Sequence, residues 1–183
     1  MRPQLGKEKI LDAALHLFAQ KGYHKTSISD IAVNADVAKG LVYNYFKSKE
    51  DLLLEIISTA SFKIKNMADG MFKQKAYQEN LRGFLDGFFD NLTKNKQYFT
   101  FQIGLMFQPD LMPLVSPFLQ QRADILLNLT QELFESSSVK SPEMTARRFI
   151  SEVDGITLHY LSIYKDYPIL AIKEELYKNY KDL

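Results

Sequence analysis

The chain has 183 residues, of which 46% are hydrophobic and 25% are charged, and its formal net charge at pH 7 is +1. This balance is typical of a folded globular protein and argues against wholesale disorder. The absence of cysteine excludes disulfides, thiolate zinc sites and cysteine nucleophiles. No apolar run reaches the roughly 18–20 residues that span a bilayer, and the N-terminus lacks the apolar core of a signal peptide. We therefore expect a cytoplasmic protein without a membrane partner.

The small net charge hides an uneven distribution of charged side chains. Residues 1–50 carry eight basic and five acidic side chains, a net charge of +3, whereas residues 51–183 carry a net charge of −2. A basic N-terminal segment favours a polyanionic partner such as nucleic acid, although it fits an ordinary solvated surface as well.

Helical periodicity dominates the N-terminal part of the chain, and no segment alternates apolar and polar residues as a strand would. Ser27 and Asp30 have the spacing of a capping box, and Ser48 and Asp51 repeat it. Gly22 is placed to end the first helix. The expected helices cover residues 7–21, a short stretch after Ser27, residues 38–45 and residues 48–67.

The pattern stays helical beyond Gly70 and becomes more apolar. Prolines at positions 109, 113 and 117 mark a turn, because proline is tolerated only in the first turn of a helix. The expected helices lie near residues 81–92, 96–108, 125–134, 142–165 and 168–180. The sequence therefore predicts an all-α protein of about nine helices.

Two short helices joined by a tight turn, after a longer helix, are typical of a helix-turn-helix motif. The second short helix must present small or polar side chains to a DNA major groove about 12 Å wide. Four residues meet that demand: Lys39, Gly40, Tyr43 and Asn44. The helix that begins after Ser48 offers free N–H groups and a positive dipole end beside Lys49, which favour a phosphate.

Four stretches closely resemble the N-terminal domain of TetR-family transcriptional regulators. They are Gly22-Tyr23, Thr26 to Ala32, Ala35 to Phe46 and Lys47 to Leu52. The resemblance implies contacts to base edges or the adjacent backbone from Lys39, Gly40 and Leu41. It implies phosphate contacts from Tyr43, Tyr45 and Lys49, either kind from Asn44, and a phosphate facing Ser27 and Ser29.

Three residues depart from the family pattern, and they affect the operator sequence more than DNA binding itself. Asp36 stands in place of the common turn glycine, which is tolerable because Asp visits the left-handed region more readily than most residues. Ala38 stands in place of the Ser or Thr that caps the recognition helix, so a side-chain cap is missing unless Asp36 supplies it. Leu41 stands in place of a frequent Thr and can touch a thymine methyl but cannot donate a hydrogen bond.

The resemblance also implies a division into a helix-turn-helix DNA-binding domain, residues 1–47, and a helical ligand-binding and dimerisation domain, residues 48–183. Aromatic and methionine side chains at helical spacing are more often core than pocket. The ligand pocket that the resemblance implies would use Phe62, Met67, Phe84, Phe88, Phe101 and Met106. The two-fold seam that it implies would use Val153, Gly155, Ile156, Leu158, Leu161, Ile172 and Leu176, for which burial within one chain is an equal alternative.

The sequence therefore predicts a homodimeric, ligand-responsive regulator that binds a double-stranded DNA operator. A repressor released by a small apolar or aromatic effector is favoured, and an activator or a helical protein–protein adaptor with the same N-terminal domain is the alternative. We expect no enzyme, since no catalytic or nucleotide-binding constellation emerges. We expect no cofactor and no metal, because His16, His24 and His159 lack ligand spacing.

Overall fold

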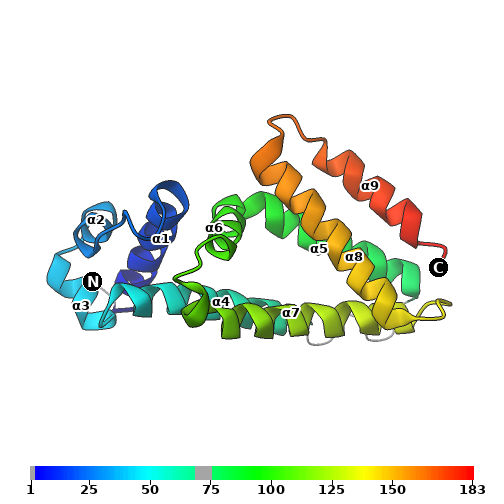
Figure 1. Ribbon diagram of the computed structural model, residues 1–183, viewed down its shortest axis with the longest axis horizontal. Helices are drawn as coiled ribbons and strands as arrows, with labels where there is room; N and C mark the ends of the chain where they lie inside the picture. The colour runs from blue at the N-terminus through cyan, green and yellow to red at the C-terminus, as the bar shows by residue number, and fades with distance from the viewer. Residues whose placement is uncertain (1–2, 69–75) are drawn as a thin grey trace. The chain divides into compact units, whose positions relative to one another are not determined.

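The computed structural model describes the backbone of residues 3–68 and 76–183, and the side chains of residues 5–59 and 76–183. Over this part of the chain it contains nine α-helices, one π-helix and no strand, which confirms the all-α prediction (Figure 1). The α-helices are α1 (Pro3–Lys21), α2 (Ile28–Asn34), α3 (Lys39–Tyr45), α4 (Lys49–Ala68), α5 (Tyr77–Lys94), α6 (Lys96–Met106), α7 (Met112–Glu135), α8 (Pro142–Leu158) and α9 (Ile169–Tyr180). The π-helix η1 covers His159–Ile163.

The chain forms two compact units that are not contiguous in sequence. The head unit combines residues 1–62 with residues 97–118, and the body unit combines residues 63–96 with residues 119–183. The functional division expected at residues 47 and 48 stays a prediction.

The head unit is built on α1, which contacts both α2 and α3 (Figure 1). One face of α1 is buried, with Ile10 and Ala14 fully inaccessible to solvent. Because these apolar residues are one helical turn apart, they form the stripe against which the short helices pack. Gly22 ends α1 with φ +81°, a left-handed conformation that suits glycine.

Helix α6 belongs to the head unit because its side chains contact α1. The ring of Phe101 stacks on that of Phe18, with 5.9 Å between the ring centroids. One turn earlier, Gln97 Nε2 lies 2.6 Å from His16 Nδ1. After α6 ends, the carboxylate of Asp110 lies 2.9 Å from His24 Nε2 in the α1–α2 loop.

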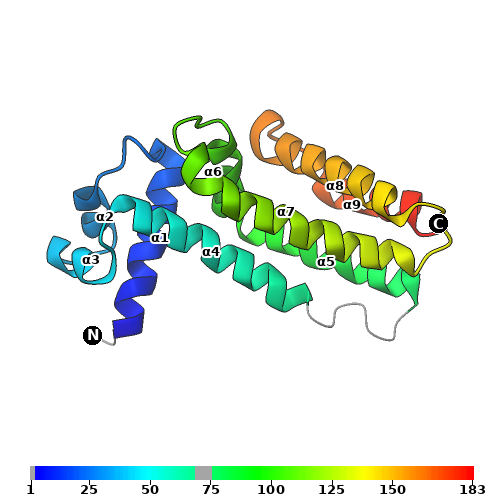
Figure 2. The same cartoon turned by 60° about the horizontal axis from the view of Figure 1, so that its bottom comes forward.

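An aromatic cluster forms the core of the body unit. Phe149 in α8 contacts Phe84 of α5, Phe134 of α7 and Tyr180 of α9, with ring centroids 4.9–5.8 Å apart. Tyr77 Oη donates a hydrogen bond of 2.8 Å to the backbone oxygen of Tyr180. Helices α8 and α9 therefore run side by side in opposite directions, with α5 alongside, as both views show (Figures 1 and 2).

Two helix boundaries differ from the sequence prediction for local reasons. Helix α7 begins at Met112 and contains Pro117 in its second turn, although we expected the prolines to precede the helix. Pro117 costs one backbone hydrogen bond near the helix start, where neighbouring turns still hold the helix. The helix expected to run to residue 165 is α-helical only to Leu158 and continues as η1 to Ile163.

Candidate nucleic-acid interface

Helix α2 begins at a complete capping box, as the sequence predicted. Ser27 Oγ accepts a hydrogen bond of 3.1 Å from the backbone N–H of Asp30. The carboxylate of Asp30 accepts in return from the backbone N–H of Ser27 at 3.0 Å and from its hydroxyl at 2.8 Å. Ser27 and Ser29 are both exposed, so the first turn of α2 presents two hydroxyls to solvent.

The turn between α2 and α3 has the geometry that the family glycine would provide. Asp36 has φ +54°, which confirms that it occupies the left-handed region. Ala38 is the N-cap of α3 in extended backbone and makes no side-chain hydrogen bond there. The recognition helix therefore begins without an N-cap side-chain bond, and the turn fixes its position through backbone hydrogen bonds such as Val37 N–H to Ala32 O at 3.0 Å.

Helix α3 exposes one continuous face. Lys39, Gly40, Tyr43 and Asn44 are all exposed, and Val42 on the other side is fully buried. At 100° per residue the four exposed residues share an arc of about 140°. This face thus offers an ammonium group, a bare backbone, a phenol and an amide on one side of a short helix.

Leu41 and Tyr45 lie on a different side of α3, against α1. Both are half-buried. A Cβ built on the buried Gly6 would lie 3.3 Å from Tyr45 Oη and 3.8 Å from Leu41 Cδ2. Gly6 therefore allows α1 and α3 to approach closely, and the base contact of Leu41 and the phosphate contact of Tyr45 stay predictions.

The N-terminus of α4 is capped by a variant of the expected capping box. Ser48 Oγ accepts from the backbone N–H of Asp51 at 3.1 Å, as predicted. The Asp51 carboxylate accepts at 2.9 Å from the backbone N–H of Lys47, one residue before the cap. Lys47 itself is exposed, so a cationic side chain lies directly before this helix N-terminus.

Lys49 connects the first turn of α4 to the α1–α2 loop. Its Nζ donates hydrogen bonds of 2.9 Å to the backbone oxygens of Tyr23 and Thr26. It also lies 4.3 Å from the centroid of the Tyr23 ring, a cation–π contact. An ammonium group has three donors, so these two bonds leave one N–H for a further acceptor.

Local charges at the interface follow from these hydrogen bonds. The backbone N–H of Ser27, followed by its hydroxyl, lowers the pKa of Asp30. The pKa of Glu50 is lowered chiefly by its own backbone N–H and then by the hydroxyl of Ser48. Burial raises the pKa of Tyr23 to about 12, and the nearby carboxylates of Glu50 and Asp110 add to this shift. Tyr23 is therefore a neutral phenol within the head unit.

The residues expected to line a ligand pocket do not share one environment. Phe84 is buried in the aromatic core of the body unit, and Phe88, half-buried, lies next to Phe89 on α5. Phe101 is buried in the head unit against Phe18, whereas Met106 is 64% exposed. The side chains of Phe62 and Met67 lie outside the described residues. The role of the whole set stays a prediction.

The residues expected at a dimer seam divide into a buried and an accessible group. Val153, Ile156 and Leu176 are buried within the chain, which is the alternative that the sequence left open. Gly155 and Leu158 are exposed on α8, and Leu161 and Ile172 are half-buried.

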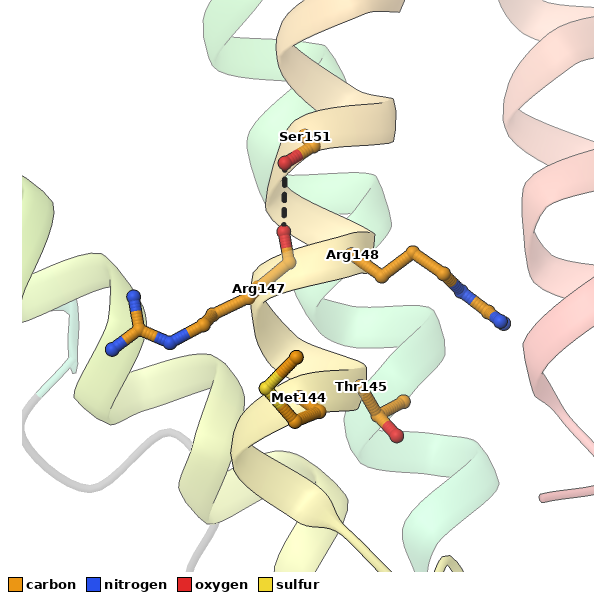
Figure 3. Close-up of a pocket in the computed structure, with 5 residues that line it drawn as sticks. All are labelled: Met144, Thr145, Arg147, Arg148 and Ser151. Carbon is orange, nitrogen blue, oxygen red and sulfur yellow. Dashed lines mark hydrogen bonds between the residues drawn. The ribbon is translucent and has the colours of Figure 1, made fainter.

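The exposed side of α8 also carries a shallow surface pocket lined by Met144, Thr145, Arg147, Arg148 and Ser151 (Figure 3). Arg147 and Arg148 project to opposite sides of α8 in this view, and Ser151 Oγ donates to the backbone oxygen of Arg147 at 2.9 Å. Met144 is 62% exposed. This side of α8 is therefore an accessible strip with small residues, Ser151 and Gly155, at its centre.

Sequence reasoning missed two polar residues that lie in apolar helical stretches. Gln102 in α6 is 5% exposed. In the body unit, burial raises the pKa of Asp154 although solvent reaches the side chain, and the charge of Arg122 on α7 offsets part of that shift. The signal available in the sequence was a polar residue within an apolar helical stretch. Among the side chains described, no three His, Asp or Glu residues gather as a metal site requires, and no helix there is long and apolar enough to cross a bilayer.

Comparison with known proteins places this geometry in a family. The sequence profile of the bacterial regulatory proteins of the tetR family matches residues 10–56. An uncharacterized HTH-type transcriptional regulator of Bacillus subtilis, YuxN, is 36% identical over 105 residues, which are 53% of this chain and 34% of that protein. The match thus spans about a third of the length of that relative. The crystal structure of a transcriptional regulator from Aquifex aeolicus is 26% identical with a TM-score of 0.75, over 95% of this chain and 96% of that one.

Residues 10–56 belong to the tetR family of bacterial regulatory proteins. The fold of the chain also matches that of the transcriptional regulator FadR of Bacillus subtilis, solved in complex with stearoyl-CoA, with a TM-score of 0.76. The two chains are 23% identical over 93% of this chain and 95% of FadR. The profile match covers α2, α3 and the turn between them, so it agrees with the helix-turn-helix motif that the sequence predicts. The match of residues 10–56 to a family of regulatory proteins also agrees with the expectation that the chain is not an enzyme.

Proposed function

We propose that the protein is a cytoplasmic transcriptional repressor that binds a pseudopalindromic DNA operator and leaves it when a small apolar or aromatic effector binds. The observation that carries this proposal is the exposed face of α3, Lys39, Gly40, Tyr43 and Asn44. A helix that is buried on one side and exposes a cation, bare backbone, a phenol and an amide on the other has the chemistry of a recognition helix.

Each interface residue has a role that its position supports. Lys39 and Asn44 can reach base edges, because an ammonium donates to guanine and an amide pairs with adenine. Gly40 lets the DNA backbone approach α3, and Tyr43 donates to a phosphate. Ser27, Ser29, Tyr45 and Lys49 hold the flanking phosphates, and Leu41 touches the nearest base or backbone at the edge of α3.

The ligand-binding function is assigned to residues 48–183, with residues 1–47 as the DNA-binding domain. Two features support an apolar effector. The body is rich in aromatic side chains, including Phe84 and Phe88, and apolar pockets with few polar groups are the usual small-molecule sites. The FadR structure of the same fold holds stearoyl-CoA, a ligand with a long apolar chain.

The homodimer is assigned to α8 and α9. The accessible strip on α8 around Gly155 can admit a second helix closely because glycine has no side chain there. Leu158 is 37% exposed and Leu170 on α9 is 65% exposed, so both offer apolar surface to a second copy. In a dimer the two α3 helices must lie about 34–36 Å apart to enter successive major grooves. An effector releases DNA only if it binds more tightly to a state with a different spacing.

Selection of genomic DNA fragments with the purified protein tests the proposal. We expect one recovered motif with two-fold symmetry and half-sites about one helical turn apart. The Asn44→Ala variant should relax the preference at one position of each half-site, whereas Asn179→Ala, an exposed amide on α9, should leave the motif unchanged. Recovery of fragments without a common motif would contradict the proposed function.

A further inference from the structure

Gln102 in α6 is a buried amide in apolar surroundings. The buried residues of α6 are Phe99, Phe101, Gln102 and Leu105. At 100° per residue, Gln102 lies about 60° from Leu105 on one side and about 60° from Phe99 on the other. Its side chain therefore leaves α6 in the middle of the buried face, between two apolar neighbours, and is 5% exposed.

The amide nitrogen of Gln102 has no hydrogen-bond partner among the residues that the structure describes. A buried donor without an acceptor is costly, and native proteins rarely keep one without a structural or functional reason. Leu or Met would fill the same volume without that cost. The position is therefore suited to a group that arrives from outside the chain and brings an acceptor.

We infer that Gln102 is the polar contact of the effector site, and that the effector is an apolar molecule with a carbonyl oxygen that accepts a hydrogen bond from its amide. This inference rests on the proposed function, because it assumes that the chain responds to a small molecule. The flanking Phe99 and Leu105 supply apolar surface for the rest of the ligand. One polar group in an apolar wall is the usual composition of a small-molecule site.

The position of Gln102 also links ligand binding to the DNA-binding helices. On the same helix, Phe101 stacks on Phe18 and Gln97 approaches His16, and both partners are in α1. Position 102 is about 100° around α6 from Phe101, so a ligand at Gln102 and the ring of Phe18 contact neighbouring positions of the same helix. A ligand that turns or shifts α6 therefore acts on α1 directly, and α1 carries α2 and α3.

Two compounds that differ only at the carbonyl test the inference with the full-length protein. Benzophenone and diphenylmethane share one frame, with a carbonyl replaced by a methylene, and 2-undecanone with undecane makes an aliphatic pair. Dissociation constants come from calorimetry, with the shift in melting temperature as a second readout. We expect one ketone to bind about 3- to 10-fold more tightly than its hydrocarbon, as one net hydrogen bond provides.

The Gln102→Met variant should bind the ketone and the hydrocarbon equally, because it keeps the volume and loses the amide. Gln120→Met, which removes an exposed amide on α7 that donates to Asp124, is the matched control and should keep the preference. The inference is overturned if the wild type shows no preference, if Gln102→Met retains it, or if neither ketone binds. A crystal structure with a water on the Gln102 amide and the ketone elsewhere would overturn it as well.

The same samples separate this inference from the proposed function. A protein that binds ketones through Gln102 but recovers no DNA motif keeps the inference and contradicts the repressor. A protein that recovers a symmetric motif but ignores every ketone contradicts the inference and keeps DNA binding.

Discussion

Lys49 Nζ lies 2.9 Å from the backbone oxygen of Tyr23 and 4.3 Å from the centroid of the Tyr23 ring. The first turn of α4 is thereby bonded to the loop that leads into α2. Lys49, which we assign to phosphate binding, thus also holds the helix-turn-helix together. The two roles can be measured separately, one as DNA affinity and the other as thermal stability.

The Lys49→Ala variant should show both roles at once. Loss of the two hydrogen bonds to carbonyl oxygens lowers thermal stability, and loss of one phosphate contact lowers the slope of log affinity against log salt by about one. The measurement is fluorescence anisotropy with selected operator DNA at several salt concentrations, beside a thermal melt. Lys25→Ala, an exposed lysine of the head unit, is the control for charge alone. A destabilised variant with the full salt slope would refute the phosphate contact and leave Lys49 a purely structural residue.

The capping box of α2 makes the stability of the head unit depend on acid pH. The hydrogen bonds from Ser27 lower the pKa of Asp30 below its usual value of 3.8, so the folded state favours the carboxylate. This contribution is present above pH 3.8 and is lost as the pH falls through the folded-state pKa, because the unfolded chain then binds the proton more readily. Asp30→Asn should therefore be less stable than the wild type near neutral pH, and the two urea midpoints should converge as the pH falls below 3.8.

Asp12→Asn is the matched control for this pH series, since Asp12 is an exposed carboxylate on α1 outside any capping box. Parallel curves for wild type and Asp30→Asn at every pH would show that the Asp30 charge contributes nothing to α2.

Phe149 is the centre of the aromatic core of the body unit. It is 1% exposed and contacts rings from α5, α7 and α9. Phe149→Ala should lower the free energy of unfolding by about 3–5 kcal/mol, because it removes buried apolar surface and leaves a cavity. Urea denaturation followed by circular dichroism measures the loss. Phe107→Ala removes a ring that is 73% exposed and should change stability by less than about 0.5 kcal/mol; a comparable loss in both variants would contradict the assigned core.

A substitution at Gly155 can test the association of two chains without lowering the stability of one chain. A Cβ built there meets no atom within 4 Å among the described residues, so Gly155→Leu fits the single chain and improves helix propensity by up to about 1 kcal/mol. At a close helix–helix seam the same side chain would force two α8 helices apart. We expect Gly155→Leu to be predominantly monomeric in sedimentation velocity at concentrations where the wild type is dimeric. Gly83→Leu, at an equally open glycine of α5, should remain dimeric, and a dimeric Gly155→Leu variant would place the seam elsewhere.

The sequence predicted the capping box of α2 and the turn before α3 correctly, because both depend on residues that are close together in the chain. Ser27 and Asp30 form their capping box because both partners lie within one helical turn, so their spacing in sequence sets their distance in space. Asp36 adopts positive φ in the turn for the same kind of reason, since the preference belongs to the residue itself.

Contacts between distant segments could not be predicted in the same way. The two carbonyl partners of Lys49 lie 26 and 23 residues earlier in the chain, and no periodicity encodes such a bond. The pattern on α6 predicted an apolar helix but could not show that Phe101 would stack on α1, or that Met106 would be exposed. The sequence could not single out Gln102, because a polar residue in an apolar stretch does not reveal whether its side chain has a hydrogen-bond partner.

The head unit takes residues 97–118 from beyond α5 to complete a structure that begins at the N-terminus. Translation delivers α1 before the ring of Phe101 that covers Phe18 exists. The N-terminal helices therefore leave the ribosome with part of their apolar surface exposed, and they reach their final packing only after residue 118 has been made. A nascent chain halted at residue 62 should consequently be more accessible to chaperones and proteases than one halted after α7.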